Sequence, residues 1–129
     1  MSQLHIELLH DTVNLIIKDF SQFDLEVKFS GNVEGAYEEL KAELFPQVED
    51  LVNNNNETLM SILYRIDVNE KKIANLLDDS NGQKYAEVIV DLILDREWQK
   101  ALTRKYFKLM DEGWTKKDIE KKLPKKLKL

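Results

Sequence analysis

The chain has 129 residues and a formal net charge of −5, and 43% of its residues are hydrophobic and 33% are charged. This length predicts one domain over residues 1–129, and the apolar content is too high for an intrinsically disordered chain. Because the sequence contains no cysteine, thiol catalysis, iron–sulfur ligation, cysteine-bound zinc and disulfide scaffolds are excluded.

Apolar spacing predicts a first helix over about residues 4–23, carried by Val13, Ile16, Ile17 and Phe20. Residues 24–30 allow two interpretations. Alternating apolar and polar residues favour a half-buried strand, with Leu25, Val27 and Phe29 on its inner side. The same segment also fits a helix that ends at Gly31. The unpaired backbone groups of a lone strand would need a partner from another chain, or a loop laid over the core.

Two further helices are expected over about residues 33–52 and 57–66, joined by a connector at residues 53–56. Pro46 lies inside the first of them. Because proline removes a backbone donor and its ring presses on the preceding turn, we expect a kink or break near Phe45. Asn54, followed by Glu57 three residues later, predicts the start of the next helix.

Asn69 is expected to cap a fourth helix, which a turn at residues 78–82 would end. Residues 83–110 form the longest periodic segment and predict a single helix. Its portion from residue 88 to 94 is apolar on nearly every side, so other helices should surround it. A last helix should follow Gly113, with Thr115 as its cap and a buried face formed by Trp114, Ile119 and Leu123.

These elements predict an all-α bundle of five or six helices around residues 83–110, with at most one short strand near residues 25–29. Charge is distributed unevenly along this bundle. Residues 1–60 hold 3 Lys or Arg against 12 Asp or Glu, whereas residues 96–129 hold 12 against 5. The basic segment at about residues 115–129 is either a solvated tail or a site for an anionic partner. Its candidate anion-binding residues are Lys116, Lys117, Lys121, Lys122, Lys125 and Lys126.

Residue types that carry catalysis or hold metals do not form a workable set. His5 and His10 are five positions apart and point away from each other on a helix. Glu87, Asp91 and Asp95 recur every four residues, but the histidines of a dinuclear carboxylate bundle are missing, so a solvated or ion-paired strip is favoured. We therefore predict no catalytic residue, metal, cofactor or small-molecule ligand.

Polar residues interrupt the apolar face of the long helix and mark a candidate interaction site. They are Arg96, Gln99, Lys100, Thr103 and Arg104. Polar groups on such a face must be hydrated, paired or engaged in a function, because burying an unpaired guanidinium is costly. Either the helix passes from one packing environment to another, with Arg96 reaching a carboxylate such as Asp67, or these residues build a small polar pocket or recognition surface.

The sequence thus favours a non-catalytic interaction or regulatory protein that binds a protein partner or its own copies. The alternative is a nucleic-acid-binding protein that uses the C-terminal lysines. An enzyme with a carboxylate-and-arginine site is a third interpretation. Without a targeting signal the default location is cytoplasmic, and the apolar alternation at residues 126–129 is too short to favour a membrane.

Overall fold

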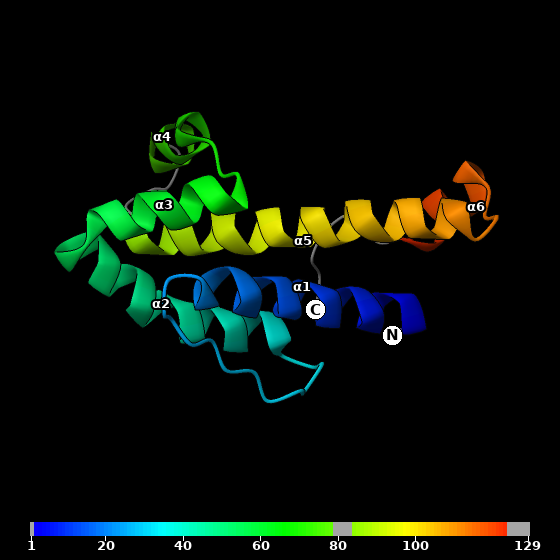
Figure 1. The fold of residues 1–129 in the computed structure, drawn as a ribbon, viewed down its shortest axis with the longest axis horizontal. Coiled ribbons are helices and arrows are strands. Elements are labelled where there is room, and N and C mark those ends of the chain that lie inside the picture. The colour runs from blue at the N-terminus through cyan, green and yellow to red at the C-terminus, as the bar shows by residue number, and fades with distance from the viewer. Residues whose placement is uncertain (1, 79–83, 124–129) are drawn as a thin grey trace.

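The computed structural model describes residues 2–78 and 84–123, which form an all-helical bundle as expected (Figure 1). No strand occurs in these ranges. The helices are α1 (Gln3–Ser21), α2 (Ala36–Asn54), α3 (Asn56–Ile66), α4 (Glu70–Asp78), α5 (Tyr85–Asp111) and α6 (Lys116–Lys122). None of these helices combines the length and the apolar content that crossing a membrane requires.

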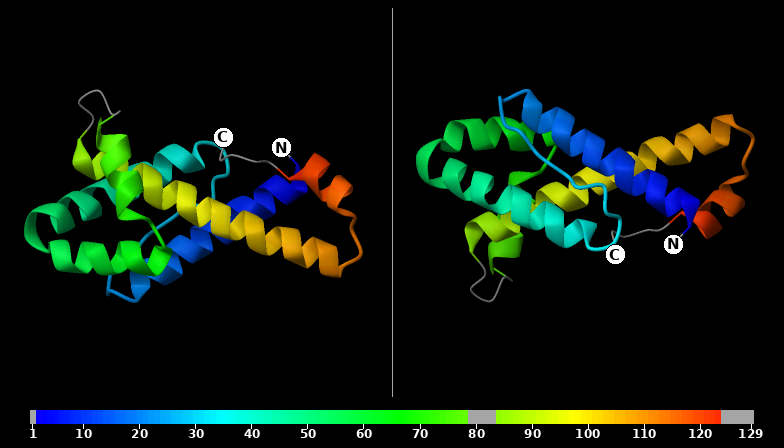
Figure 2. Two further views of the ribbon diagram at one scale, coloured as in Figure 1. Left: turned by 90° about the horizontal axis from the view of Figure 1, so that it is seen from above. Right: turned by 90° about the horizontal axis from the view of Figure 1, so that it is seen from below.

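The long helix α5 is continuous over 27 residues and contacts every other helix that the structure describes. Helix α1 crosses it, α2 and α3 pack near its beginning, and α6 folds back at its end (Figures 1 and 2). Its apolar portion is enclosed, since Ile89, Ile93 and Leu94 are fully buried in the main core. The prediction of one enclosed helix is therefore confirmed from residue 85, whereas Gln83 lies outside the described residues.

Residues 25–32 are an extended segment that belongs to neither a strand nor a helix, so both interpretations of this segment were wrong. The alternation of burial is nevertheless present, with Val27 only 4% exposed against the core. Glutamates of α2 replace the missing partner strand. The backbone N–H of Lys28 donates to Glu43 Oε1 at 3.1 Å, and that of Ser30 donates to Glu39 Oε2 at 2.7 Å.

Helix α2 continues through Pro46, so of the kink or break expected near Phe45 the break does not occur. Leu44 and Val48 on either side of it are both fully buried, and this packing outweighs the lost backbone hydrogen bond. The expected connector shrinks to one residue between α2 and α3. Asn55, not Asn54, caps α3, because its Oδ1 accepts from the backbone N–H of Thr58 at 3.2 Å.

The caps of the last two short helices were predicted correctly. Asn69 precedes α4, and its Oδ1 accepts from the backbone N–H of Lys71 at 2.8 Å. Thr115 precedes α6, and its hydroxyl accepts from the backbone N–H of Asp118 at 3.2 Å. The expected turn lies outside the described residues except for Asp78, which is helical.

Candidate interaction surface

The five polar residues predicted as one site on α5 lie in three different surroundings. Arg96, Gln99 and Thr103 line a hollow of about 630 Å³ beside the start of α4. Lys100 points instead toward α1. Arg104 borders a separate hollow of about 310 Å³ between α5 and α1. The five positions share one broad side of α5, but α4 flanks one edge of it and α1 the other, so their side chains meet different neighbours.

Arg96 pairs with Asp67, the carboxylate that the sequence suggested for it. Its Nη2 lies 3.2 Å from Asp67 Oδ2, and its Nε donates to the Asp67 backbone carbonyl at 3.3 Å. Asp67 has a left-handed backbone conformation at the end of α3, and its side chain is 84% exposed. The pair therefore ties α5 to the loop between α3 and α4 while remaining in contact with solvent, where an ion pair contributes little stability.

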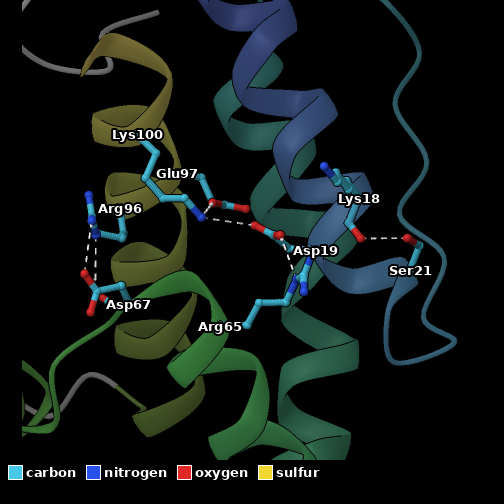
Figure 3. A network of polar contacts seen from close by, with 8 residues as sticks. All are labelled: Lys18, Asp19, Ser21, Arg65, Asp67, Arg96, Glu97 and Lys100. Carbon is cyan, nitrogen blue, oxygen red and sulfur yellow. Dashed lines mark hydrogen bonds and ion pairs between the residues drawn. The ribbon is translucent and has the colours of Figure 1, made fainter. Parts of the chain in front are cut away.

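Lys100 enters a charged network between α1, α3 and α5, which is drawn in Figure 3. Its Nζ lies 2.9 Å from Glu97 Oε1 and 3.3 Å from Asp19 Oδ2. Arg65 of α3 reaches the same aspartate, with its Nε 3.0 Å from Asp19 Oδ1. Glu97 is fully buried and Asp19 is 5% exposed, so two carboxyl groups share one dry interface with two cations.

The two carboxyl groups of this network titrate in opposite directions. Burial, together with the neighbouring Asp19 carboxylate, raises the pKa of Glu97 to about 8. Burial also acts to raise the pKa of Asp19, but a hydrogen bond from Glu97 and the charges of Lys100 and Arg65 outweigh it and hold that pKa below its usual value. A pKa of about 8 favours the protonated form of Glu97 near neutral pH, and the ion pairs of Asp19 with Lys100 and Arg65 fasten α1 to α5 and α3.

A second ionic contact joins the same helices nearer the N-terminus. Lys105 is only 8% exposed, and its Nζ lies 3.3 Å from Glu7 Oε2 and 3.5 Å from Asp11 Oδ2. The contacts of Lys100 and Lys105 thus engage two basic residues of the range 96–129 with acidic residues of α1. Part of the charge asymmetry in the sequence is therefore neutralised inside the molecule.

An apolar groove runs between the end of α5 and α6, and we call it the α5–α6 groove. It has a volume of about 350 Å³ and is lined by Leu102, Thr103, Tyr106, Phe107, Ile119, Glu120 and Leu123. Phe107 is 60% exposed and meets Tyr106 edge to face, with ring centroids 5.6 Å apart. Met110, the next residue on this face of α5, is 44% exposed.

Tyr106, Phe107 and Met110 recur at helical spacing on the long helix, but the groove also depends on α6 and was not predicted. The usable signal was in the last helix, where Ile119 and Leu123 recur at helical spacing opposite that face. Ile119 is fully buried as expected, whereas Leu123 and Trp114 are half-buried. Leu123 therefore leaves part of its surface to the groove.

The candidate anion-binding lysines are only partly within the described residues. Lys116, Lys117, Lys121 and Lys122 are exposed on α6, which they share with Asp118 and Glu120. Lys125 and Lys126 lie outside the part that the structure describes.

Acidic residues and histidines do not gather into a metal site anywhere in residues 2–78 and 84–123. Asp91, at the centre of the acidic strip on α5, lies 3.0 Å from Lys41 Nζ and accepts a hydrogen bond from the Tyr37 hydroxyl at 3.2 Å. At Asp91 the strip is therefore ion-paired, which is one of the two arrangements that the sequence favoured. His5 packs against Trp98, with ring centroids 5.8 Å apart.

Comparison with protein-family models, curated proteins and solved structures gives no significant match to this chain. Functional inference therefore rests on the geometry and chemistry of the surface alone.

Proposed function

We propose that this chain is a non-catalytic binding protein that holds a segment of another protein in the α5–α6 groove. The observation that carries the proposal is the exposure of Phe107 beside an apolar groove of about 350 Å³. Large aromatic side chains next to pockets are the residues that most often dominate the binding energy of protein interfaces. Exposed apolar side chains that gather in one place mark interaction sites more often than scattered ones.

The walls of this groove are supported from behind, which favours recognition without a large rearrangement. Leu102 and Leu123 pack on a small core formed by Leu8, Leu15, Trp98 and Ala101. Gly113, with a φ of +97°, allows the sharp turn that brings α6 back against α5. A preformed groove loses little conformational entropy when a partner enters it.

Nucleic-acid binding by the C-terminal lysines is the competing proposal. A phosphate backbone requires cations, but it has no use for an apolar groove. On α6, two pairs of lysines flank Asp118 and Glu120, and these acids reduce the positive potential there. The geometry therefore favours a protein partner over a nucleic acid.

Site-specific photo-cross-linking in cells that express the protein tests this proposal. A photoreactive phenylalanine analogue at position 107 should give a discrete covalent adduct with another protein, whereas the same analogue at position 64 should not. Position 64 is a suitable control because Tyr64 is 88% exposed but lies on α3, away from the groove.

A groove-filling variant separates binding in the groove from nonspecific capture. Thr103 is exposed and lines the groove, so Thr103→Trp should fill it and abolish the adduct formed at position 107. The matched variant Ser61→Trp, at an exposed position on α3, should leave the adduct intact. An adduct that survives Thr103→Trp, or equal adducts from positions 107 and 64, would overturn the proposal.

A further inference from the structure

We infer that Ser30 is a phosphorylation site, and that a phosphate on its hydroxyl breaks its contact with Glu39 and releases residues 28–32 from α2. This site belongs to the extended segment at residues 25–32 and is separate from the α5–α6 groove, because no residue of that segment lines the groove. Three features of Ser30 carry the inference: its hydrogen bonds, the charges around it and its exposure.

Side chains of α2 hold the backbone of the extended segment at every second residue. The attached residues are Glu26, Lys28 and Ser30, and their partners on α2 are Gln47, Glu43 and Glu39, in that order. Because the partners recur every four residues, one side of α2 faces the whole segment. Val27 is 4% exposed and anchors the middle of the segment in the core, whereas Ser30 is exposed. The end of the segment near Ser30 therefore depends mainly on Glu39.

Ser30 makes two hydrogen bonds to this one carboxylate. Its backbone N–H donates to Glu39 Oε2 at 2.7 Å, and its hydroxyl donates to Glu39 Oε1 at 2.6 Å. In the described part of the chain, the other serine and threonine hydroxyls that donate a hydrogen bond use backbone carbonyls. Ser30 is thus the described hydroxyl residue at which an added negative charge would meet a carboxylate directly.

Phosphorylation would turn this attraction into repulsion. A protein kinase would transfer the terminal phosphoryl group of a nucleoside triphosphate to Ser30. The bond between phosphorus and the nucleoside diphosphate breaks, a bond between phosphorus and Ser30 Oγ forms, and the hydroxyl proton is released. Oγ then has no hydrogen to donate to Glu39, and a group with a charge of about −1.5 to −2 lies beside the carboxylate.

The surroundings of Ser30 contain too few free cations to neutralise a phosphate. Residues 26–43 hold five glutamates and only two lysines, Lys28 and Lys41. Lys41 is engaged elsewhere, since its Nζ lies 3.0 Å from Asp91 Oδ1. Lys28 is exposed two residues before Ser30 and can offset about one charge, which leaves the rest of the phosphate charge facing the glutamates. The first turn of α2 already holds two of these acids, so its N-terminus offers a phosphate little attraction.

A kinase can reach this hydroxyl in the folded protein. Ser30 is exposed, lies in a segment without regular secondary structure, and precedes Gly31, which has a φ of +90°. The right-hand view of Figure 2 shows the segment on the outside of the bundle, between the end of α1 and the start of α2. Release of residues 28–32 would remove Phe29, which is half-buried, from its packing on the main core. Phosphorylation would therefore expose apolar surface that the segment now covers.

Amide hydrogen exchange of the full chain, with phosphoserine introduced genetically at position 30, tests the release. We expect the protection factor of the amide at position 30 to fall by about tenfold or more, with a smaller decrease at Lys28 and little change in α5. Phosphoserine at position 61, which is exposed on α3, is the matched control and should leave the amide at position 30 unchanged. An unchanged protection factor in the protein modified at position 30 would overturn the inference.

Two variants separate charge repulsion from the loss of one hydrogen bond. Ser30→Ala removes the hydroxyl but keeps the backbone bond to Glu39, so the protection factor should fall by less than about threefold. Glu39→Gln keeps an acceptor but removes the charge, and in this background phosphoserine should also lower protection by less than about threefold. If Ser30→Ala loosens the segment as much as phosphoserine does, or if Glu39→Gln gives no relief, charge is not the cause and the inference is wrong.

Phosphopeptide mapping of the chain isolated from its own cells tests whether the modification is made. We expect phosphate on Ser30. Phosphate confined to other residues, or none on the chain, would refute Ser30 as a phosphorylation site even if the exchange measurements show that its contact with Glu39 is sensitive to charge.

Discussion

Lys100 Nζ lies 3.3 Å from Asp19 Oδ2, and this contact joins the middle of α5 to the end of α1. The same ammonium group lies 2.9 Å from the fully buried Glu97. Two carboxyl groups and a lysine can share such a buried site only if their total charge is kept low, which explains the raised pKa of Glu97. The network therefore links the packing of α1 against α5 to pH.

The free energy of unfolding should fall as the pH rises from about 4.5 to about 8. Glu97 has a pKa of about 8 in the folded chain, against 4.5 for an ordinary glutamate, so the folded state binds a proton that the unfolded state has released. Its stabilising contribution is complete below about pH 4.5 and is lost progressively up to about pH 8, with a total on the order of 5 kcal/mol. Urea unfolding across this range measures it.

Glu97→Gln is the control for this pH dependence because an amide keeps the shape of the side chain without titrating. The variant should be less sensitive to pH than the wild type, and the difference between the two curves isolates this one group. Parallel curves for the two proteins would show that Glu97 does not hold the proton.

Asp19→Asn should destabilise the fold, because it weakens the contacts to Lys100 and Arg65 in a nearly dry interface. We expect a loss of about 1–3 kcal/mol in chemical denaturation, discounted because Arg65 is partly solvated. Asp67→Asn removes the charge from another ion pair of α5, but the Asp67 side chain is 84% exposed. It should change stability by less than about 0.5 kcal/mol, and equal effects at the two sites would contradict the role of burial.

The extended segment at residues 25–32 should loosen locally when its glutamate partner is removed. In Glu39→Ala the backbone N–H and hydroxyl of Ser30 lose acceptors that now lie 2.7 and 2.6 Å away. Amide hydrogen exchange at Ser30 should become faster, with little change in the core of α5. Glu38→Ala, in the same turn of α2 and exposed, is the matched control and should leave that amide unchanged.

Leu94→Ala should be among the most damaging single changes, because Leu94 is fully buried in the part of α5 that the other helices enclose. The lost packing and the cavity predict a cost of about 2–5 kcal/mol. Met110→Ala on the same helix removes a side chain that is 44% exposed and should cost well under half as much. Thermal unfolding of both variants compares them directly, and similar costs would mean that the helix is not enclosed at Leu94.

Local signals in the sequence were sufficient for the helices and for most of their caps. The stripe of Val13, Ile16 and Phe20 and the caps Asn69 and Thr115 act within a few residues of chain, so each can be recognised from its neighbours alone. The break considered at Pro46 does not occur, for the same reason. Its local effect is to break a helix, but burial of Leu44 and Val48 against distant elements holds α2 together.

The candidate site was less accessible to sequence reasoning, because it depends on where each residue points. Arg96, Lys100 and Arg104 are spaced every four residues, yet each has different surroundings. Arg96 faces a hollow beside α4, Lys100 enters a buried network, and Arg104 borders a hollow beside α1. The burial of Glu97 was not recognised, since its partner Asp19 is 78 residues earlier in the chain.

The sequence by itself determined an all-helical chain with a long apolar helix at its centre and a basic C-terminal part, because periodicity and charge are properties of neighbouring residues. Only the tertiary structure decided which cations are neutralised within the fold and that Phe107 borders a groove. Those properties depend on the distances between helices that are remote in sequence, and pairwise packing, not local spacing, sets these distances.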